Sequence, residues 1–391
     1  MIPRLKPSYD LSDWKAALSF FSKGNVQAFE DEFASKFECA HGVMFAHGRT
    51  ALYALLKVWG LEHSEVICPA YTCVVVADAI VLSSNIPVFV DCGEGSFNMS
   101  YEGLEAALTE KTRAILVTHL WGYAMDVERV AEIVNRAEKK YGHKIYVIQD
   151  CAHSYGARWQ GKMVTRFGDA SIFGSNIAKI INSIFGGMVL CHDQTTSENL
   201  RTFRQQHCRR DRSKSFKRLL YFVAVNVAFN HLVYGLVHFL ERNGWLDRFV
   251  KYYEEGVIAF PADWDLLPCE IEARVGRNQL RKYDRIIADR QKQSRAIIEP
   301  LETRKDIWCL PFDPDCTYSH LVALAEDRSR WMNFYLRHGV QLGMLIEYSI
   351  PYMKAYRQYS RGDYPVSKSY SERAINFPTW PGCDFELKEG S

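Results

Sequence analysis

Residues 146–157 read YVIQDCAHSYGA and are the most informative stretch of this chain. The stretch starts as a β-branched apolar run and closes on Asp150, which is the pattern of a buried strand that ends in a polar residue. Short runs of the same kind lie on both sides, separated by helical patterns, at Glu65–Cys68, Pro87–Asp91, Ala114–Thr118, Ser171–Phe173 and Met188–Leu190. Strands that alternate with helices predict βαβ units and a mostly parallel sheet.

Helical patterns fill the connections between these strands. Apolar residues recur at helical spacing in Thr50–Trp59, Val74–Leu82 and Val127–Lys140, and a charged helix is expected from Glu270 to Ile298. At 391 residues the chain exceeds the size, roughly 250 to 300 residues, at which one hydrophobic core stops growing. We therefore expect a large α/β domain at residues 1–254 and a smaller α+β domain at residues 255–391.

Composition and charge exclude several classes of protein. Apolar residues make up 48% of the chain and charged residues 24%, as in ordinary soluble globular proteins. The formal net charge is only +2, so no overall field favours nucleic acid as a partner. The eleven scattered cysteines include no Cys-x-x-Cys pair and give no sign of a metal site or a disulfide framework. The first residues, MIPRLKP, lack the apolar stretch of a signal peptide, so we expect a cytoplasmic location.

One segment departs from the α/β pattern. Residues 201–218 hold eight Lys or Arg against one acid, Asp211, and residues 219–240 form an apolar stretch interrupted by Asn and His. These polar interruptions make a lipid-spanning helix costly. We expect a helical excursion at about 201–240 that packs on the protein or on a partner subunit. A basic amphipathic element that rests on an anionic membrane is the alternative.

The polar residues that follow the expected strands are candidates for chemistry. In an open α/β sheet the ligand lies at the carboxyl ends of the strands, where His119 and Asp150 fall. Lys179 follows Asp150 by 29 positions and precedes a glycine pair at 186–187. Pyridoxal phosphate needs a lysine amine to bind its aldehyde and a carboxylate to keep its ring nitrogen protonated, and Lys179 and Asp150 match these roles. His153 lies near enough to Asp150 to hydrogen-bond the phenolic oxygen of the ring.

The phosphate of that cofactor needs backbone N–H groups at the start of a helix. The tripeptide Gly48-Arg49-Thr50 opens the first strong helical pattern, and Thr50 also offers a hydroxyl. Because threonine is a common N-cap for purely structural reasons, this motif is informative only together with Asp150 and Lys179.

These residues lie within blocks that resemble the DegT/StrS family of sugar aminotransferases, which have the aspartate-aminotransferase fold. The likeness extends over nearly the whole chain and is strongest at residues 149–157. Its other blocks are Phe29–Ala34, His47–Leu52, Pro69–Cys73, Pro87–Asp91, His119–Gly122, Gly168–Ser171, Gly186–Gly187 and Ile271–Gly276, followed by Tyr283, Asp284 and Arg290. The resemblance implies a large domain with a mostly parallel sheet of the seven-stranded type, flanked by helices, and a smaller C-terminal domain.

The resemblance also implies an activity and a set of roles. It implies an aminotransferase that uses pyridoxal 5'-phosphate to move an amino group from glutamate or glutamine to a keto-sugar carried on a nucleotide, in the biosynthesis of amino sugars. It implies a homodimer with both active sites at the subunit interface. The residues that it assigns are Lys179 as Schiff-base lysine and proton shuttle, Asp150 at the pyridine nitrogen, His153 at the phenolic oxygen, and Gly48, Arg49 and Thr50 near the phosphate.

Three positions depart from the family pattern. Gly174 stands where the family usually has a phosphate-binding serine, so either Ser175 takes over this contact or the contact is absent. Cys73 stands where many members have the aromatic residue that stacks on the ring, and Tyr71 or another aromatic residue would then supply the ring face. Asp265 aligns with the asparagine that usually reaches across the dimer to the phosphate, where an acid would be unfavourable.

Two other functions stay open at this point. The first is a relative that dehydrates or otherwise processes a sugar with the same cofactor. Known dehydratases of the family carry histidine at the lysine position, so Lys179 speaks against this function. The second is a catalytically silent scaffold or regulator, docked to a membrane through residues 201–240. The joint presence of Asp150, His153 and Lys179 favours the enzyme.

Overall fold

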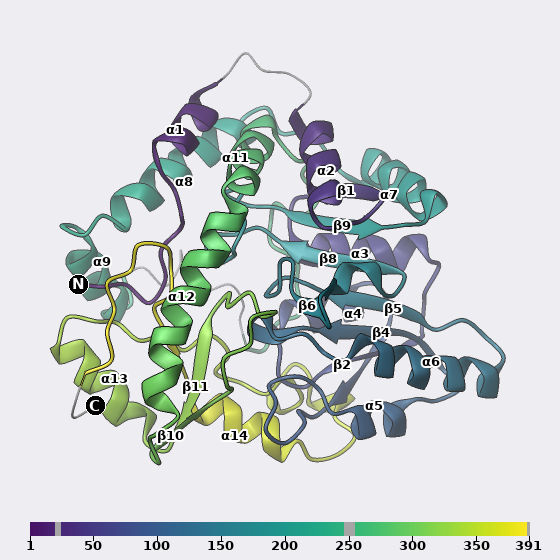
Figure 1. Ribbon diagram of the computed structural model, residues 1–391. Coiled ribbons are helices and arrows are strands. Elements are labelled where there is room, and N and C mark those ends of the chain that lie inside the picture. The colour runs from purple at the N-terminus through teal and green to yellow at the C-terminus, as the bar shows by residue number, and fades with distance from the viewer. Residues whose placement is uncertain (20–24, 246–254, 389–391) are drawn as a thin grey trace.

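The computed structural model of the protein describes residues 1–19, 25–245 and 255–388 (Figure 1). Its largest element is a seven-stranded sheet with the strand order β1-β9-β8-β5-β4-β2-β3. Strand β9 runs antiparallel to both neighbours, and the other neighbouring pairs are parallel. The strands are β1 (His41–Phe45), β2 (Glu65–Pro69), β3 (Ile86–Val90), β4 (Thr112–Thr118), β5 (Tyr146–Asp150), β8 (Ala170–Gly174) and β9 (Gly187–Cys191). The mostly parallel sheet that the sequence predicts is confirmed.

Helices cover both faces of this sheet. Val66 and Cys68 of β2 share a core cluster with α3 (Gly48–Val58) and α4 (Val75–Leu82), whereas Ile67 shares another with α5 (Tyr101–Ala107) and α6 (Val127–Tyr141). Because successive side chains of a strand point to opposite faces, the two helix pairs lie on opposite sides of the sheet. The remaining elements around the sheet are α1 (Leu11–Leu18), α2 (Asn25–Lys36), α7 (Gln194–His207), η1 (Leu120–Gly122), η2 (Val164–Arg166), β6 (Arg158–Trp159) and β7 (Lys162–Met163).

The sequence of α6 explains why it begins and ends where it does. The side chain of Asp126 accepts a hydrogen bond from the backbone N–H of Arg129 and so caps the first turn. Gly142 follows the last turn with a left-handed backbone (φ 73°), which favours glycine. The buried residues in between recur at helical spacing and are Val127, Val130, Ile133, Val134 and Ala137.

A second, smaller sheet lies beside the large one (Figure 1). It is antiparallel with the order β10-β11-β12 and shares a core with α12 and α13. Its elements are α11 (Glu270–Arg281), α12 (Tyr283–Leu301), β10 (Ile307–Cys309), β11 (Leu321–Ala325), α13 (Arg328–Arg337), η3 (Ile350–Tyr352), η4 (Arg357–Tyr359), α14 (Pro365–Arg373) and β12 (Ala374–Phe377). Helix α11 contacts α1 and α2, so the domain boundary at residue 254 stays a prediction.

Two elements differ from the sequence-based prediction. The sequence-based prediction does not include strand β1, which forms at the sheet edge by pairing with β9. The helix expected over residues 270–298 is two helices, α11 and α12, which meet at Lys282.

The excursion at 201–240 continues α7 and then forms α8 (Lys214–Ala228) and α9 (Tyr234–Arg242). The expectation that it packs on the protein holds for one face only. Phe222, Val225 and Tyr234 are buried, whereas many of the other large apolar side chains of the stretch are exposed. Within the described ranges, the structure contains no helix of the length and apolarity that crossing a bilayer requires.

Candidate active site

Asp150 ends β5 and is buried at the carboxyl edge of the sheet. Its Oδ1 accepts the N–H of Ala152 at 3.0 Å, and its Oδ2 accepts the hydroxyl of Thr118 at 3.3 Å. Burial raises the pKa of Asp150, while the N–H of Ala152, the charge of Lys179 and the hydroxyl of Thr118 act in the opposite direction. A fixed, buried carboxyl group of this kind suits a protonated heterocyclic nitrogen as partner.

Lys179 lies on the loop between β8 and β9, whose start is held by two backbone bonds. The N–H of Ser175 donates to Gly186 O at 2.8 Å, and the N–H of Ser183 donates to Ser175 O at 3.1 Å. Burial lowers the pKa of Lys179, and the neighbouring Cys73 and Asp150 partly oppose this. A buried amine with a lowered pKa is more often neutral, which is the form that attacks an aldehyde.

His153 lies against the edge of Trp121, with ring centroids 4.9 Å apart, and its centroid is 5.6 Å from that of His320. Burial, with further contributions from Lys179 and His320, lowers its pKa far below the usual value, so the ring is neutral. Its Nδ1 has no hydrogen-bond partner among the described residues. Buried polar atoms are normally paired, so this nitrogen points to a ligand.

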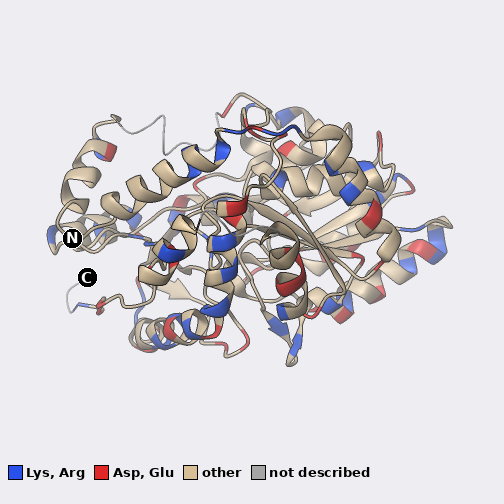
Figure 2. Cartoon of the chain, turned by 90° about the horizontal axis from the view of Figure 1, so that it is seen from above, with Lys and Arg blue, Asp and Glu red and all other residues tan. Residues whose placement is uncertain are grey.

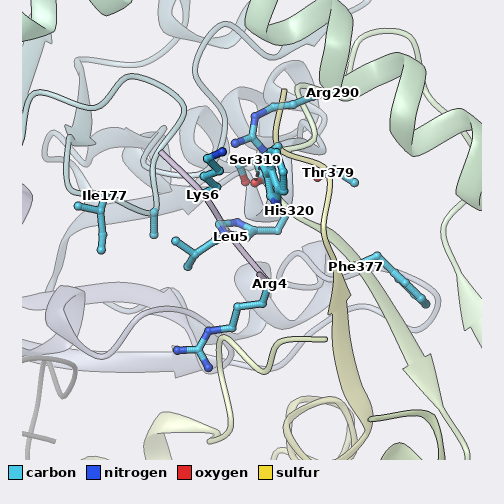
Figure 3. Close-up of a pocket in the computed structure, with 11 residues that line it drawn as sticks. Arg4, Leu5, Lys6, Ile177, Arg290, Ser319, His320, Phe377 and Thr379 are labelled. Carbon is cyan, nitrogen blue, oxygen red and sulfur yellow. Dashed lines mark hydrogen bonds between the residues drawn. The ribbon is translucent and has the colours of Figure 1, made fainter. Parts of the chain in front are cut away.

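A pocket beside the Lys179 loop brings in residues that the sequence did not single out (Figure 3). It is lined by Ile177 and Ala178 of the loop and by Arg290, Ser319 and His320, and the N-terminal segment Arg4–Lys6 runs along it. No local motif marks His320, whose proximity to His153 depends on the packing of the two sheets. The sequence marks Arg290 only as part of a block that resembles the family.

Arg290 is a buried cation. Its Nη1 donates to the carbonyl oxygens of Ser319 at 2.9 Å and Tyr318 at 3.2 Å, and its Nε has no partner among the described residues. Burial lowers its pKa to about 10, so it stays charged at neutral pH. A buried guanidinium with donors to spare fits an anionic ligand.

The expected phosphate region is the start of α3. A Cβ atom added to Gly48 would lie 3.2 Å from Gly174 Cα. A Cβ atom added to Gly174 would lie 4.0 Å from Lys179 Cε, so Gly174 lies between the start of α3 and the lysine. The hydroxyl of Thr50 donates to Trp264 O at 3.0 Å. Arg49 Nη1 lies 3.5 Å from Asp78. The first-turn N–H groups of a helix, rather than these two side chains, are therefore the best phosphate donors here.

The departures from the family pattern each have a place in the structure. Ser175 is buried, with its Oγ 3.4 Å from the hydroxyl of Tyr155, close to the Gly174 position. Cys73 precedes α4 and is near enough to Lys179 to affect its pKa. Asp265 pairs with Arg209 at 2.8 Å, which compensates its charge.

Tyr71 and His119 both use their polar atoms for hydrogen bonds within the protein. Tyr71 is buried and donates to Ile346 O at 3.3 Å, and another aromatic residue, Trp121, lies beside His153. The residue that supplies the ring face stays a prediction. His119 lies near the strand ends as expected, but both its ring nitrogens are used within the protein. Its Nδ1 accepts the N–H of Met125 at 2.9 Å, and its Nε2 lies 2.8 Å from Gln149 Oε1.

A family model for the DegT/DnrJ/EryC1/StrS aminotransferase family matches residues 15–233 and 268–388, which is most of the chain. The chain belongs to this family. It is a pyridoxal-phosphate-dependent aminotransferase, and the buried Lys179 amine, the Asp150 carboxyl group and the unpartnered His153 Nδ1 fit that cofactor.

Individual relatives agree with this assignment. The GDP-perosamine synthase of Escherichia coli O157:H7 is 28% identical over 375 residues, covering 93% of this chain and 88% of the relative. Among solved structures, a putative sugar aminotransferase from Streptococcus pneumoniae in its PLP form superposes with a TM-score of 0.76 at 18% identity, covering 98% of this chain and 94% of that one. The sugar aminotransferase CalS13 from Micromonospora echinospora has a TM-score of 0.77 at 20% identity, covering 100% and 96%. These structural likenesses show the fold.

Proposed function

We propose that this aminotransferase takes an amino group from glutamate or glutamine and delivers it to a keto-sugar carried on a nucleotide. The full-length similarity to GDP-perosamine synthases supports a nucleotide-linked sugar as acceptor. The observation that carries the proposal is the buried Lys179 amine within electrostatic reach of the buried Asp150 carboxyl group. The product would enter the biosynthesis of amino sugars.

Each residue of the site has a proposed task. Bound pyridoxal phosphate supplies an aldehyde that receives the amino group and a ring that takes up the electrons of the broken Cα–H bond. Lys179 holds the cofactor between turnovers and, once released, moves the proton from the substrate Cα. Asp150 keeps the ring nitrogen protonated, and its hydrogen bonds from Thr118 and Ala152 fix its orientation. His153, neutral and unpartnered at Nδ1, bonds the phenolic oxygen.

The pocket at Arg290 is proposed to receive a carboxylate of the amino donor. Its unpartnered Nε lies in a pocket shared with the Lys179 loop. A charged hydrogen bond to a carboxylate would orient the donor so that its amine faces the lysine side.

A homodimer with shared active sites and a cytoplasmic location belong to the same proposal. At the start of α3, the side chains of Thr50 and Arg49 contact Trp264 O and Asp78 of the same subunit. They therefore leave the phosphate site short of side-chain donors, which another subunit would supply. In the family pattern that contribution comes from the second subunit.

The test uses the purified protein with added pyridoxal phosphate. We expect a visible absorbance from lysine-bound cofactor, its bleaching by glutamate or glutamine, and its recovery with the right keto-sugar nucleotide. Lys179→Ala should lose both the absorbance and at least about 10²-fold of the rate, because it removes the proton-transferring group. Lys36→Ala, which removes a partly exposed lysine paired with Asp284, is the matched control and should behave as wild type. A colourless wild-type protein would contradict the proposal.

A further inference from the structure

Exposed apolar side chains lie on α8, in the turn that follows it, on α9 and just beyond α9. Those of α8 recur at spacings of four and seven residues, and those of α9 at three, so each set lies on one side of its helix. The exposed fractions run from 53% at Leu220 to 80% at Leu232. We call this set the outer apolar face; it consists of Phe216, Leu220, Val227, Leu232, Leu236, Phe239 and Trp245.

The outer apolar face is not needed to attach these helices to the protein. The inner side of α8 already does so, because Phe222 is fully buried against Tyr9 and Trp14, with ring centroids 4.7 and 4.9 Å apart. In α9, Tyr234 is buried and its hydroxyl donates to Gln341. Soluble proteins rarely expose connected apolar patches unless these bind something.

The unpaired charge around the face is positive, because the two acids that flank it, Asp211 and Glu241, pair with Lys217 and Arg4 of this chain. From Arg212 to Leu240 the sequence contains no Asp or Glu. In Figure 2 the coloured residues of α8 are blue and lie towards one end, and the rest of the helix is tan. Lys214 and Arg218 point inward and pair with the buried Glu272 at 2.9 and 2.7 Å. The ion pairs with Glu272 thus account for two of the basic residues, Lys214 and Arg218. The exposed basic residues need another explanation.

The exposed basic residues that no described carboxylate pairs with lie just before α8, since Arg209 and Lys217 pair with Asp265 and Asp211. Arg210 and Arg212 are exposed, and no carboxylate within the described part of the chain pairs with either. They stand at the start of the same helix whose outward side is apolar. At the other end, beyond α9, stands Trp245, which is 76% exposed.

We propose that the outer apolar face, with Arg210 and Arg212, docks this enzyme onto a membrane surface that contains anionic phospholipids. Apolar side chains of helices that lie in the membrane plane enter the boundary between headgroups and acyl chains, while arginines bind the phosphates. Tryptophan favours that boundary as well. The two helices lie along the surface, because neither is long and apolar enough to cross.

A second copy of the chain is a poorer occupant than a membrane. If the face met itself across a two-fold axis, the only carboxylates beside it among the described residues would be Asp211 and Glu241, which already pair with Lys217 and Arg4. In addition, α9 falls within residues 234–267, which the family model leaves unmatched. Leu236, Phe239 and Trp245 of the face therefore lie outside the matched residues, whereas its members on α8 lie within them.

The experiment sediments the full-length, cofactor-loaded protein with vesicles. We expect binding to phosphatidylcholine vesicles that contain phosphatidylglycerol at low salt, weaker binding at high salt because charge is screened, and little binding to phosphatidylcholine alone. Leu236→Ser combined with Phe239→Ser should reduce binding at least about tenfold, since it removes buried apolar area. Arg210→Glu combined with Arg212→Glu should do the same at low salt.

The matched control for charge is Lys139→Glu combined with Lys140→Glu in α6, on the opposite side of the molecule (Figure 1). It makes the same change in net charge and should leave vesicle binding intact. Equal binding of both vesicle types, or unchanged binding in both face variants, would overturn the proposal. Light scattering without lipid gives a second such outcome. If either face variant forms a smaller particle than the wild type, the face joins two copies of the chain and the proposal is overturned. Arg210 and Arg212 lie outside both helices, so their substitution should not disturb helix folding. The arginine variant therefore tests membrane binding even if the α9 variant does not fold.

Discussion

Gly187, the first residue of β9, lies directly against the backbone of His47 at the start of α3. A Cβ atom at Gly187 would stand 2.3 Å from the carbonyl carbon of His47 and 2.4 Å from Gly48 N. Only glycine allows this approach, which joins the end of the Lys179 loop to the helix start proposed for the phosphate.

Gly187→Ala should therefore destabilise the protein and weaken its hold on the cofactor. Overpacking of this kind costs about 1–3 kcal/mol of unfolding free energy. Urea unfolding and titration with pyridoxal phosphate measure the two effects. Gly235→Ala is the control, because a Cβ atom there meets nothing within 4 Å and alanine favours a helix. Wild-type stability and affinity in Gly187→Ala would refute the close contact.

His119 should make the folded protein less stable as the pH falls. Burial lowers its pKa to about 4 in the folded state, whereas an unfolded histidine has a pKa of about 6.5. Between these values the unfolded chain binds more protons, so stability is lost as pH falls through this window, by about 3 kcal/mol in total. Unfolding free energies of wild type and His119→Gln across this range test it. The other buried histidines are present in both proteins, so a slope that does not flatten in the variant would contradict the prediction.

Gly174→Ser should strengthen cofactor binding. A Cβ atom at Gly174 meets Lys179 Cε only at 4.0 Å, so there is room for the side chain. A hydroxyl there would add one hydrogen bond to an anion, worth about 1.5–3 kcal/mol at most. The dissociation constant of pyridoxal phosphate is the measurement, with Gly174→Ala as the control that adds the carbon without the hydroxyl. If serine and alanine behave alike, the phosphate does not lie at this position.

Arg290→Met should raise the KM for the amino donor about tenfold or more, because it removes a charged hydrogen bond and leaves the donor carboxylate unpaired. The visible absorbance of the bound cofactor should persist, since Arg290 is not proposed to hold it. Arg304→Met, at an arginine paired with Asp306 at 2.9 Å, is the matched control and should leave the KM unchanged. An unchanged KM together with lost cofactor absorbance in Arg290→Met would assign Arg290 to the cofactor or to the fold.

The parts of the site that depend on local order are predictable from the sequence. Asp150 ends a buried strand, and His153 and Lys179 follow at a recognisable spacing, so the amino-acid pattern alone predicts these three residues as members of the site. Local spacing does not predict what surrounds them. His320 and Arg290 reach the site from the part of the chain around the small sheet, and Trp121 rather than Tyr71 lies beside His153.

The sequence by itself determined the α/β class and predicted Lys179 and Asp150 as site residues, because alternating apolar runs and polar strand ends are local patterns. Only the tertiary structure decided how the basic and apolar excursion is used. Whether an amphipathic helix buries its apolar side depends on which neighbours are within reach. In α8 Phe222 and Val225 find partners in the protein, whereas Phe216, Leu220 and Val227 do not. The same packing explains why Lys214 and Arg218 turn inward to Glu272 and Arg210 and Arg212 remain at the surface.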